Sequence, residues 1–410
     1  MQPSLSISNS EKTLAPLLSR PVLKWIFIIF FLGLAFSAFE ISLRIFWVPP
    51  LDTREEFLVR HDPLLGWRKT PYAAATHKNH EYTVIEKYNS KGLRGPEYSY
   101  EKQADEYRVL VLGDSHAEGH SVKFDDLFSE VLKRKLNERS PHDQVINQVI
   151  NAGTGGYSTD QELLFFQNEG KKYQPDLTIL TFSLNNVLYN SLTAISSWYK
   201  PLFELKTGEL RLTRVPVPRP EEPPHYKIRR FLKSRSYVSK FLYDKISRSS
   251  FYLFLNRWGL TRFPDQFRVW QINETAQIRD SWKLTEALLV KLRQEVELSG
   301  SRFVIFYVPV AASVYPEAWQ EKQNKYGLSD TEWDPLRDSR RLEEICRRHG
   351  IDFVNPVELF RQAAARNPQK NYYSFKNEHW VRDGHELAGE ILFEYLTETS
   401  LRGGRRPAKQ

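Results

Sequence analysis

Residues 107–115 read YRVLVLGDS, an apolar run that ends in a turn of Gly, Asp and Ser. A short, continuous apolar run bounded by turn residues is typical of a strand that is buried on both faces of a parallel sheet. Helical spacing follows in FSEVLKRKLNE, residues 128–138, and a second strand with its turn follows in QVINQVINAG, residues 144–153. A helix pattern over 159–173 and a third apolar run over 175–186 continue the series. This alternation predicts an α/β fold with a doubly wound parallel sheet.

The same alternation returns nearer the C-terminus. The patterns are a long helix over 274–300, a strand over 302–310, a helix over 337–350, a short strand over 351–356, and a turn entering a helix over 378–396. We therefore expect one sheet, flanked by helices, that is built from two separated parts of the chain. In sheets of this kind ligands bind beyond the carboxyl ends of the strands.

The N-terminal part carries the strongest apolar signal. Residues 25–39, WIFIIFFLGLAFSAF, contain no charge, and with their flanks they reach the length of about 20 residues that a membrane-spanning helix needs. Arg20 and Lys24 lie on the N-terminal side, which predicts a cytoplasmic N-terminus. We expect a single-pass anchor in the inner (cytoplasmic) membrane, with the rest of the chain extracytoplasmic, in the periplasm. The alternative is a cleaved signal peptide, for which Ala35-Phe36-Ser37 is a poor cleavage site.

An insertion interrupts the alternation between about residues 193 and 275. It contains the proline-rich stretch VPVPRPEEPP, residues 215–224, and a basic stretch over residues 227–257 in which Asp244 is the only acid. Apolar residues recur at helical spacing in the basic stretch, which predicts an amphipathic helix or helix pair. Such a helix can contact a membrane surface or form a lid that attracts an acidic polymer. The alternative is a helix that covers the core and keeps its charges in water.

These patterns divide the chain into seven parts. They are a cytoplasmic N-terminus (1–21), a transmembrane anchor region (22–48), a connecting segment (49–106), the first half of the α/β core (107–192), the Pro-rich and basic insertion (193–275), the second half of the core (276–400) and a disordered basic tail (401–410). The connecting segment contains alternating pieces such as EYTVIEKY, residues 81–88, that predict strands. The sequence assigns no chemical role to this segment.

The composition of the chain and its motifs argue against several classes of function. The net charge is +8, yet the chain contains no helix-turn-helix pattern, zinc-finger spacing or RNA-binding signature, so no nucleic-acid partner is expected. The single cysteine, Cys346, excludes an intramolecular disulfide and leaves the compartment open. No phosphate-binding loop is present, and no cofactor is expected. The spacing of His116 and His120 with His379 matches no standard ligand set, so no metal site is expected.

Ser115 is the candidate nucleophile. It follows an apolar strand, so a strand-to-helix turn would hold its hydroxyl at the carboxyl edge of the sheet, where it can face a cleft. A serine hydroxyl is a weak nucleophile and needs a base within hydrogen-bonding reach. The tripeptide Gly-Asp-Ser is common in turns, and Asp114 is interpreted as a turn and cap residue.

Four blocks of the chain resemble the GDSL/SGNH hydrolase family in order and spacing. They are GDSHAEGHSV (113–122), VINAGTGGYSTDQEL (149–163), FSLNN (182–186) and NEHWVRDGH (377–385). The resemblance implies an SGNH-type (flavodoxin-like) fold with Ser115 as nucleophile and His379 as its base. It also implies an oxyanion hole made by the backbone N–H groups of Ser115 and Gly156 and the side-chain amide of Asn185. The His-Trp pair in the last block is similar to the branch of the family associated with acetylation.

Two positions depart from the family pattern. Asn186 stands where the third block usually has Asp, and Asn377 stands two residues before His379, where the carboxylate of a triad is expected. The corresponding loss of a carboxylate costs about ten-thousandfold in kcat in a serine protease. Asn377 and Asp383 are therefore candidates for orienting His379, and a Ser-His dyad is the other arrangement. His385 is a second candidate base, although the family pattern makes it a structural residue of the closing helix.

The expected function is hydrolysis or transfer of an O-acyl group, such as acetyl, on envelope or exported polysaccharide. The substrate is then an acylated carbohydrate, and the membrane is contacted through the N-terminal helix, with residues 227–257 as a further candidate contact. The second hypothesis is an esterase acting on lipid or phospholipid, which the basic amphipathic insertion favours. The third is a catalytically decayed module that binds glycan, which the missing triad carboxylate favours.

Overall fold

A five-stranded parallel sheet forms the centre of the molecule. The computed structural model describes residues 20–47, 58–78, 81–139, 145–195, 198–220, 235–247, 263–374 and 378–402. Within them the sheet has the order β13-β12-β7-β5-β6. The bounds are β5 Glu106–Leu112, β6 Ile146–Asn151, β7 Leu177–Phe182, β12 Arg302–Tyr307 and β13 Asp352–Val354. Numbered along the chain, these strands lie in the order 2-1-3-4-5, the flavodoxin-like arrangement, and the switch point lies between β5 and β7.

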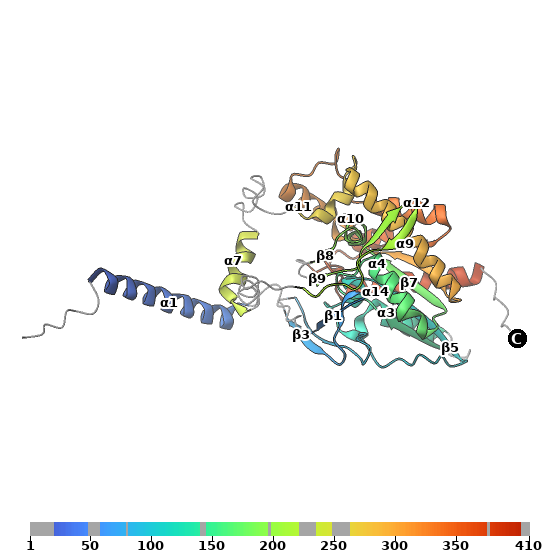
Figure 1. Ribbon diagram of the computed structural model, residues 1–410, viewed down its shortest axis with the longest axis horizontal. Helices are drawn as coiled ribbons and strands as arrows, with labels where there is room; N and C mark the ends of the chain where they lie inside the picture. The colour runs from blue at the N-terminus through green and yellow to red at the C-terminus, as the bar shows by residue number, and fades with distance from the viewer. Residues whose placement is uncertain are drawn as a thin grey trace, which may run out of the picture.

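Helices cover both faces of this sheet, so the core has three layers (Figure 1). Alternate residues of each strand serve the two faces: Leu110 and Leu112 of β5 belong to one apolar cluster, and Val109 and Val111 belong to the other. The first cluster includes residues of α4, α5, α9 and α12, and the second includes residues of α3, α13 and α14. The strands and helices predicted for the core are therefore confirmed, as is the α/β class.

The helices have the following bounds. They are α2 Ser115–Glu118, α3 Phe128–Arg139, α4 Thr159–Asn168, α5 Leu184–Tyr189, α9 Ala276–Leu298, α10 Ala311–Val314, α11 Pro316–Tyr326, α12 Arg337–His349, α13 Val357–Arg366 and α14 Arg382–Arg402, with 3-10 turns η2 Phe124–Asp126, η3 Gly170–Tyr173 and η4 Asp265–Trp270. The long helix α9 begins where the Thr275 hydroxyl accepts from the Ile278 N–H at 3.3 Å, because an N-cap satisfies one of the free donors of the first turn.

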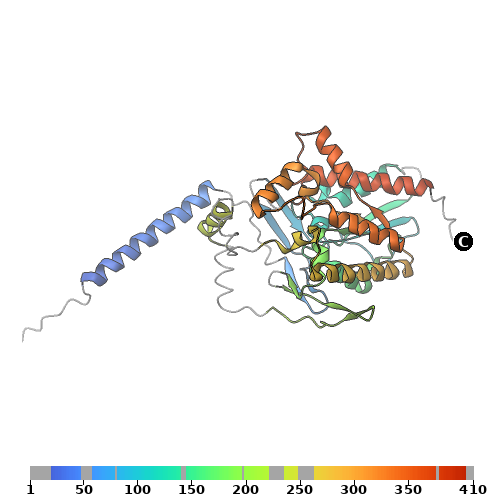
Figure 2. The same ribbon diagram turned by 90° about the horizontal axis from the view of Figure 1, so that it is seen from above.

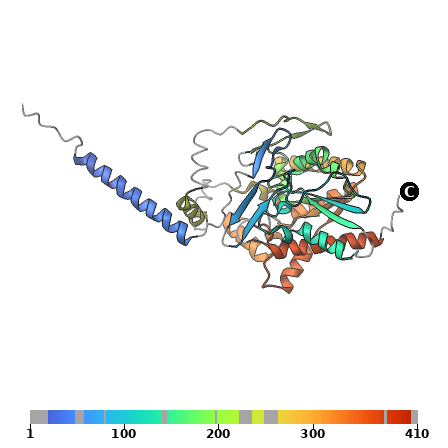
Figure 3. The ribbon, with the colours of Figure 1, turned by 90° about the horizontal axis from the view of Figure 1, so that it is seen from below.

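The connecting segment forms two antiparallel hairpins beside the core (Figure 3). The strands are β1 Val59–Asp62, β2 Gly66–Lys69, β3 Ala74–Lys78 and β4 Thr83–Lys87. The alternating pattern EYTVIEKY thus contains a strand, as predicted. Trp67 and Lys69 of β2 are buried, although the segment lies outside the α/β alternation. The hairpin β1–β2 is therefore part of the packed domain.

The insertion begins with strands that the sequence did not indicate. Two hairpins are present, formed by β8 Ala194–Ile195, β9 Trp198–Tyr199, β10 Phe203–Lys206 and β11 Glu209–Leu212. Of the stretch predicted as basic and helical, the structure describes residues 235–247, which contain the helix α7 Tyr237–Ser247. The other residues of 227–257, and the tail from residue 403, lie outside the described residues.

The N-terminal helix α1 Arg20–Phe46 extends away from the α/β core (Figures 1 and 2). An 18-residue stretch of its segment Val22–Phe46 has a mean hydropathy of 2.3, and the segment is long and apolar enough to cross a membrane. Helix α7 lies against the C-terminal end of α1, where Phe241 meets the rings of Phe39 and Trp47 at 5.8 and 5.4 Å between centroids.

Candidate active site

Ser115 lies just beyond the carboxyl end of β5, beside the switch point between β5 and β7. Gly113 permits the tight passage from strand to helix, because a Cβ there would lie 1.9 Å from a hydroxyl oxygen on β7. Asp114 caps the one-turn helix α2 and accepts from the His116 N–H at 2.9 Å. Its other oxygen accepts from the Ser183 hydroxyl at 2.8 Å. Both carboxylate oxygens of Asp114 are thus used in holding the turn.

The two residues expected to act as nucleophile and base are in direct contact. Ser115 Oγ and His379 Nε2 lie 2.7 Å apart, although 264 positions separate them in the chain. The C=O of His379 accepts from the Ser374 N–H at 2.8 Å. The next residue, Trp380, is fully buried, and its C=O accepts from the Ser121 hydroxyl at 2.6 Å. The turn before α14 is thereby tied to the loop after α2, which sets the serine–imidazole contact.

Two other histidine rings enclose the His379 imidazole. His116 stacks on it with 4.5 Å between centroids and 19° between planes, and His120 meets it edge to face at 4.6 Å. Burial lowers the pKa of His116, against the opposing effect of the Asp114 and Glu378 carboxylates. Burial also lowers the pKa of His120 to about 4. Both rings are therefore neutral at pH 7 and do not repel a positive charge on His379.

The residues considered for orienting His379 differ in their positions. Asn377 lies outside the residues that the structure describes. Asp383 lies in the first turn of α14, and within the described residues no hydrogen bond joins it to His379. Glu378 forms an ion pair with Lys322 of α11. Its φ of 58° is a conformation that costs energy for a residue other than glycine, so this ion pair holds a strained turn next to the imidazole.

His385, the second candidate base, is engaged elsewhere. Its Nδ1 lies 3.3 Å from the Phe128 N–H, from which it accepts, and its ring stacks on that of Phe128 with 6.0 Å between centroids. Burial holds the pKa of His385 well below its usual value. The ring therefore links α14 to α3, which is a structural role.

The three donors expected for an oxyanion hole follow three adjacent strands. The Ser115 N–H follows β5, the Gly156 N–H follows β6, and the side-chain amide of Asn185 follows β7. Among the described residues none of these three donors has an acceptor. A Cβ placed on Gly155 would lie 3.9 Å from Ser115 Cβ, so the loop after β6 lies against the serine.

Asn186 occupies the position where the family pattern has Asp, and it serves the fold. Its Oδ1 accepts from the Ser183 N–H at 3.0 Å, which completes a capping box at the start of α5. Its Nδ2 donates to Glu162 at 3.1 Å. Burial, together with the negative charge of Asp114, raises the pKa of Glu162 well above its usual value. An aspartate at 186 would add another acid to this buried site, so the surroundings favour asparagine.

The sequence did not indicate a buried ion pair that contacts the loop after β6. Glu118 of α2 pairs with Lys69 of β2, and their side chains are 4% and 6% exposed. Glu118 also accepts from the Tyr88 hydroxyl at 2.7 Å and from the Gly155 N–H. These residues stand tens of positions apart and form no motif, so no local signal reveals their contact.

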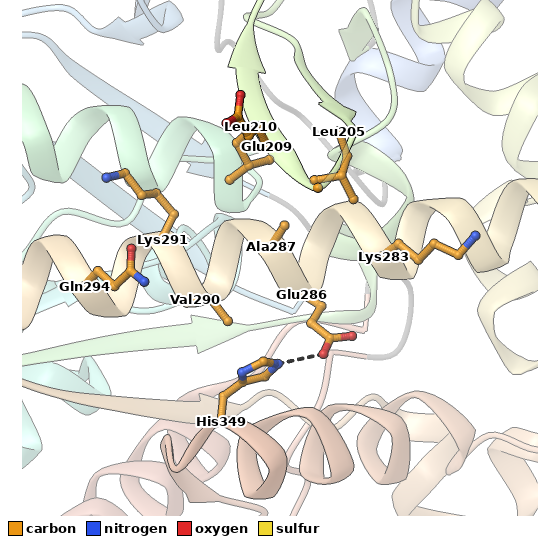
Figure 4. Close-up of a pocket in the computed structure, with 11 residues that line it drawn as sticks. Leu205, Glu209, Leu210, Lys283, Glu286, Ala287, Val290, Lys291, Gln294 and His349 are labelled. Carbon is orange, nitrogen blue, oxygen red and sulfur yellow. Dashed lines mark hydrogen bonds and ion pairs between the residues drawn. The ribbon is translucent and has the colours of Figure 1, made fainter.

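No cluster of three or more His, Cys, Asp or Glu residues in the described part of the chain is arranged to hold a metal ion. A shallow groove lies between the hairpin β10–β11 and helix α9, and His349 pairs with Glu286 in it at 2.7 Å (Figure 4). The residues that line this groove include neither Ser115 nor His379. The groove is therefore separate from the candidate active site.

Comparisons with known proteins found similarity only at the level of solved structures. No family model matches the chain, and no curated protein matches it. TesA is 8% identical, with 71% of this chain and 98% of that chain covered and a TM-score of 0.36. An acetyl xylan esterase, AlAXEase, is 10% identical, with 70% and 99% covered and a TM-score of 0.39. A putative GDSL-like lipase from Parabacteroides merdae is 13% identical, with 72% and 97% covered and a TM-score of 0.38.

Proposed function

We propose that the chain is a serine-dependent ester hydrolase or acyltransferase in which Ser115 is the nucleophile and His379 the base. The observation that carries the proposal is the 2.7 Å contact between Ser115 Oγ and His379 Nε2. The N–H groups of Ser115 and Gly156 and the amide of Asn185 supply the oxyanion hole. A hydroxyl, a base and converging donors are what acyl transfer to serine requires.

The chemistry proceeds in two halves. His379 Nε2 takes the proton of Ser115 Oγ while the oxygen attacks the ester carbonyl, and the three donors bind the oxyanion that forms. The C–O bond to the alcohol then breaks, and His379 returns the proton to the leaving oxygen. Water or an acceptor hydroxyl next attacks the acyl-serine and gives its proton to His379. The bond between the acyl carbon and Ser115 Oγ then breaks, His379 returns the proton to Oγ, and the acyl group leaves on the attacking oxygen. Water gives hydrolysis, and an acceptor hydroxyl gives transfer.

The substrate that we propose is an O-acylated, and in particular O-acetylated, carbohydrate of the envelope or of an exported polysaccharide. Support comes from the likeness of the block around His379 to the acetylation-associated branch of the GDSL/SGNH family. The neutral rings of His116 and His120 also favour a functional site, because they let His379 become positive without repulsion. A decayed glycan-binding module would not require this contact between Ser115 and His379.

The location that we propose is the outer side of the inner membrane, with α1 as the single-pass anchor. Arg20 and Lys24 precede the apolar part of α1, which supports a cytoplasmic N-terminus. Helix α7, beside the other end of α1, exposes Leu242 and Ile246 by 49% and 42%, and Lys245 is also exposed. An exposed apolar and basic face at the end of a membrane span fits the lipid surface, and it supports a lipid ester as the second candidate substrate.

The first experiment is labelling of the full chain, in mild detergent, with a fluorophosphonate probe. We expect wild type to be labelled, Ser115→Ala not to be labelled, and His379→Ala to be labelled at least about a thousandfold more slowly. Ser313→Ala is the matched control, because Ser313 is a buried serine of α10 whose hydroxyl donates to the Val310 C=O at 2.7 Å. A folded wild-type protein that resists the probe would contradict the enzymatic proposal and leave glycan binding as the activity to measure.

A second experiment separates the candidate substrates. Acetylated xylo-oligosaccharides and a fatty-acyl ester in micelles are each incubated with wild type and with Ser115→Ala. Release of acetate that depends on Ser115 is the expected result, whereas release of fatty acid alone would favour the lipid esterase. Isotope-labelled acetyl groups that appear on an added unacetylated oligosaccharide would identify transfer.

A further inference from the structure

The peptide group that joins Gly155 to Gly156 is held from outside the sheet. The C=O of Gly155 accepts from the indole Nε1–H of Trp67, on β2, at 3.1 Å. The N–H of Gly155 donates to the Glu118 carboxylate. Both backbone polar groups of Gly155 are therefore bound, which leaves the plane of the following peptide little freedom to rotate.

The bond from Trp67 also determines where the Gly156 N–H points. In a trans peptide the C=O of one residue and the N–H of the next point in opposite directions. Because the indole N–H of Trp67 donates to the Gly155 C=O, that C=O points toward Trp67 and the Gly156 N–H points away from it. Within the described residues this N–H has no acceptor. It is therefore available to an oxyanion, as the proposed function requires.

Trp67 is itself fixed in place. Only 4% of its surface is exposed, and its own C=O accepts from the Tyr157 hydroxyl at 2.6 Å. The two rings meet edge to face at 5.6 Å. The indole also lies against Gly156: a Cβ there would come within 3.3 Å of Trp67 Cζ2, and Gly156 has a φ of +80° that other residues rarely adopt. The loop and the indole thus constrain each other.

We infer that Trp67 is a positioning residue of the proposed oxyanion hole: its indole N–H holds the Gly155–Gly156 peptide so that the Gly156 N–H faces the reacting carbonyl. The inference rests on the proposed function and deepens it. It gives the connecting segment a role in catalysis, because the indole N–H that holds the Gly155 C=O belongs to Trp67 of β2, outside the α/β core. The indole does not touch the substrate and acts through the loop after β6.

The test is Trp67→Phe in the full chain, which keeps an aromatic ring and removes the N–H. Loss of alignment of one oxyanion donor is expected to lower kcat about 10- to 100-fold, with KM changed less than about twofold. The matched control is Trp270→Phe. Trp270 is also buried, and its Nε1–H donates to Asp338, at the start of α12, at the same distance of 3.1 Å. Each variant loses one buried indole bond, so a loss of stability alone would affect both.

Three outcomes decide the inference. A fall in kcat in Trp67→Phe, but not in Trp270→Phe, supports it, and equal kcat values in the two variants and wild type overturn it. If Trp67→Phe does not fold, Tyr157→Phe replaces it, because loss of the hydroxyl that holds the Trp67 C=O should lower kcat in the same direction by a smaller factor. An unchanged kcat in Tyr157→Phe would then overturn the inference.

A readout that needs no activity keeps this inference separate from the proposed function. In NMR spectra of protein labelled with 15N-glycine, the Gly156 amide gives its own signal. The chemical shift of this signal should differ from wild type in Trp67→Phe and equal the wild-type value in Trp270→Phe. An unchanged Gly156 signal in Trp67→Phe overturns the positioning role even if the enzyme is active. An inactive wild type with the expected spectral change would instead overturn the proposed function alone.

Discussion

At the scale of single residues, the imidazole of His379 lies between two other histidine rings that burial keeps neutral. A neutral ring stacked on His379 restricts its rotation and adds no positive charge beside it. In a triad, a carboxylate holds the imidazole and stabilises its charged form. In this chain His116 stacks on the His379 ring, His120 contacts it edge to face, and His379 Nε2 lies 2.7 Å from Ser115 Oγ.

The lowered pKa of His120 predicts acid sensitivity of the folded state. Above the usual histidine pKa of about 6.5 the ring is neutral in both folded and unfolded chains, so it contributes no pH dependence. Between about pH 6.5 and 4 the unfolded chain binds a proton at this ring and the folded chain does not. The free energy of unfolding therefore decreases by up to about 3 kcal/mol as the pH is lowered through this range. The charged groups that influence this ring are Glu86, Glu118, His77 and Lys69.

Chemical unfolding at a series of pH values measures this effect. His120→Phe should flatten the fall in unfolding free energy between pH 6.5 and 4 relative to wild type, because the variant has no ring to protonate. An identical slope in the two proteins would show that His120 does not carry this dependence. Burial also lowers the pKa of His385, so protonation of that ring contributes to the pH dependence of stability in wild type and in His120→Phe alike.

At the scale of elements, an acid in the apolar helix α1 serves as the cap of another helix. Glu40 accepts from the N–H groups of Tyr237 and Val238 at 2.8 and 2.9 Å and from the Ser236 hydroxyl at 3.1 Å. Arg44, one turn further along α1, donates to the Arg235 C=O at 2.7 Å. The start of α7 is thereby joined to the end of α1, which accounts for the Glu40 carboxylate near the end of a largely apolar helix.

Removal of this cap should release α7. Glu40→Ala leaves the first N–H groups of α7 without acceptors, which costs about 1 kcal/mol and corresponds to about fivefold less protection from hydrogen exchange over residues 237–247. Hydrogen–deuterium exchange of the full chain in detergent measures it. Ser42→Ala is the matched control, since Ser42 is an exposed residue of the same helix. Equal exchange of α7 in Glu40→Ala and wild type would contradict the capping role.

At the scale of the whole molecule, buried charges join the connecting segment to the core. Arg94 is 2% exposed and donates to the C=O groups of Glu118, Gly119 and Val122, which follow Ser115 in the chain. Together with the Lys69–Glu118 pair, these bonds join α2 and the loop after it to the connecting segment. The connecting segment and the α/β core should therefore unfold as one unit.

Breaking one partner of the buried pair tests this coupling. Lys69→Met leaves the Glu118 carboxylate buried without its cation, which should lower the unfolding free energy by about 3 kcal/mol. The double variant Lys69→Met with Glu118→Gln removes both charges and should recover part of the loss. Lys283→Met is the control, because Lys283 pairs with Asp280 on the exposed face of α9. A loss below about 1 kcal/mol in Lys69→Met would show that the pair does not couple the two parts.

The sequence by itself determined the α/β class and the order of the central elements. The runs that became β5, β7 and β12 are mostly apolar, and such patterns are local, because a strand buried on both faces needs apolar residues at most of its positions. The four motif blocks also indicated Ser115 and His379, which the fold brings into contact. Their catalytic roles, and the role of Asn377, stay predictions.

Only the tertiary structure decided what surrounds that contact. Trp67 and Lys69 lie in a short hairpin with no motif, and their partners are 88 and 49 positions away in the chain. The sequences of the small hairpins in the insertion also lack a strong hydrophobic periodicity. Local patterns record which face of an element is buried, whereas the bonds that hold the loop after β6 depend on which distant segment folds over it. For that physical reason the positioning of the proposed oxyanion hole became visible only in the folded chain.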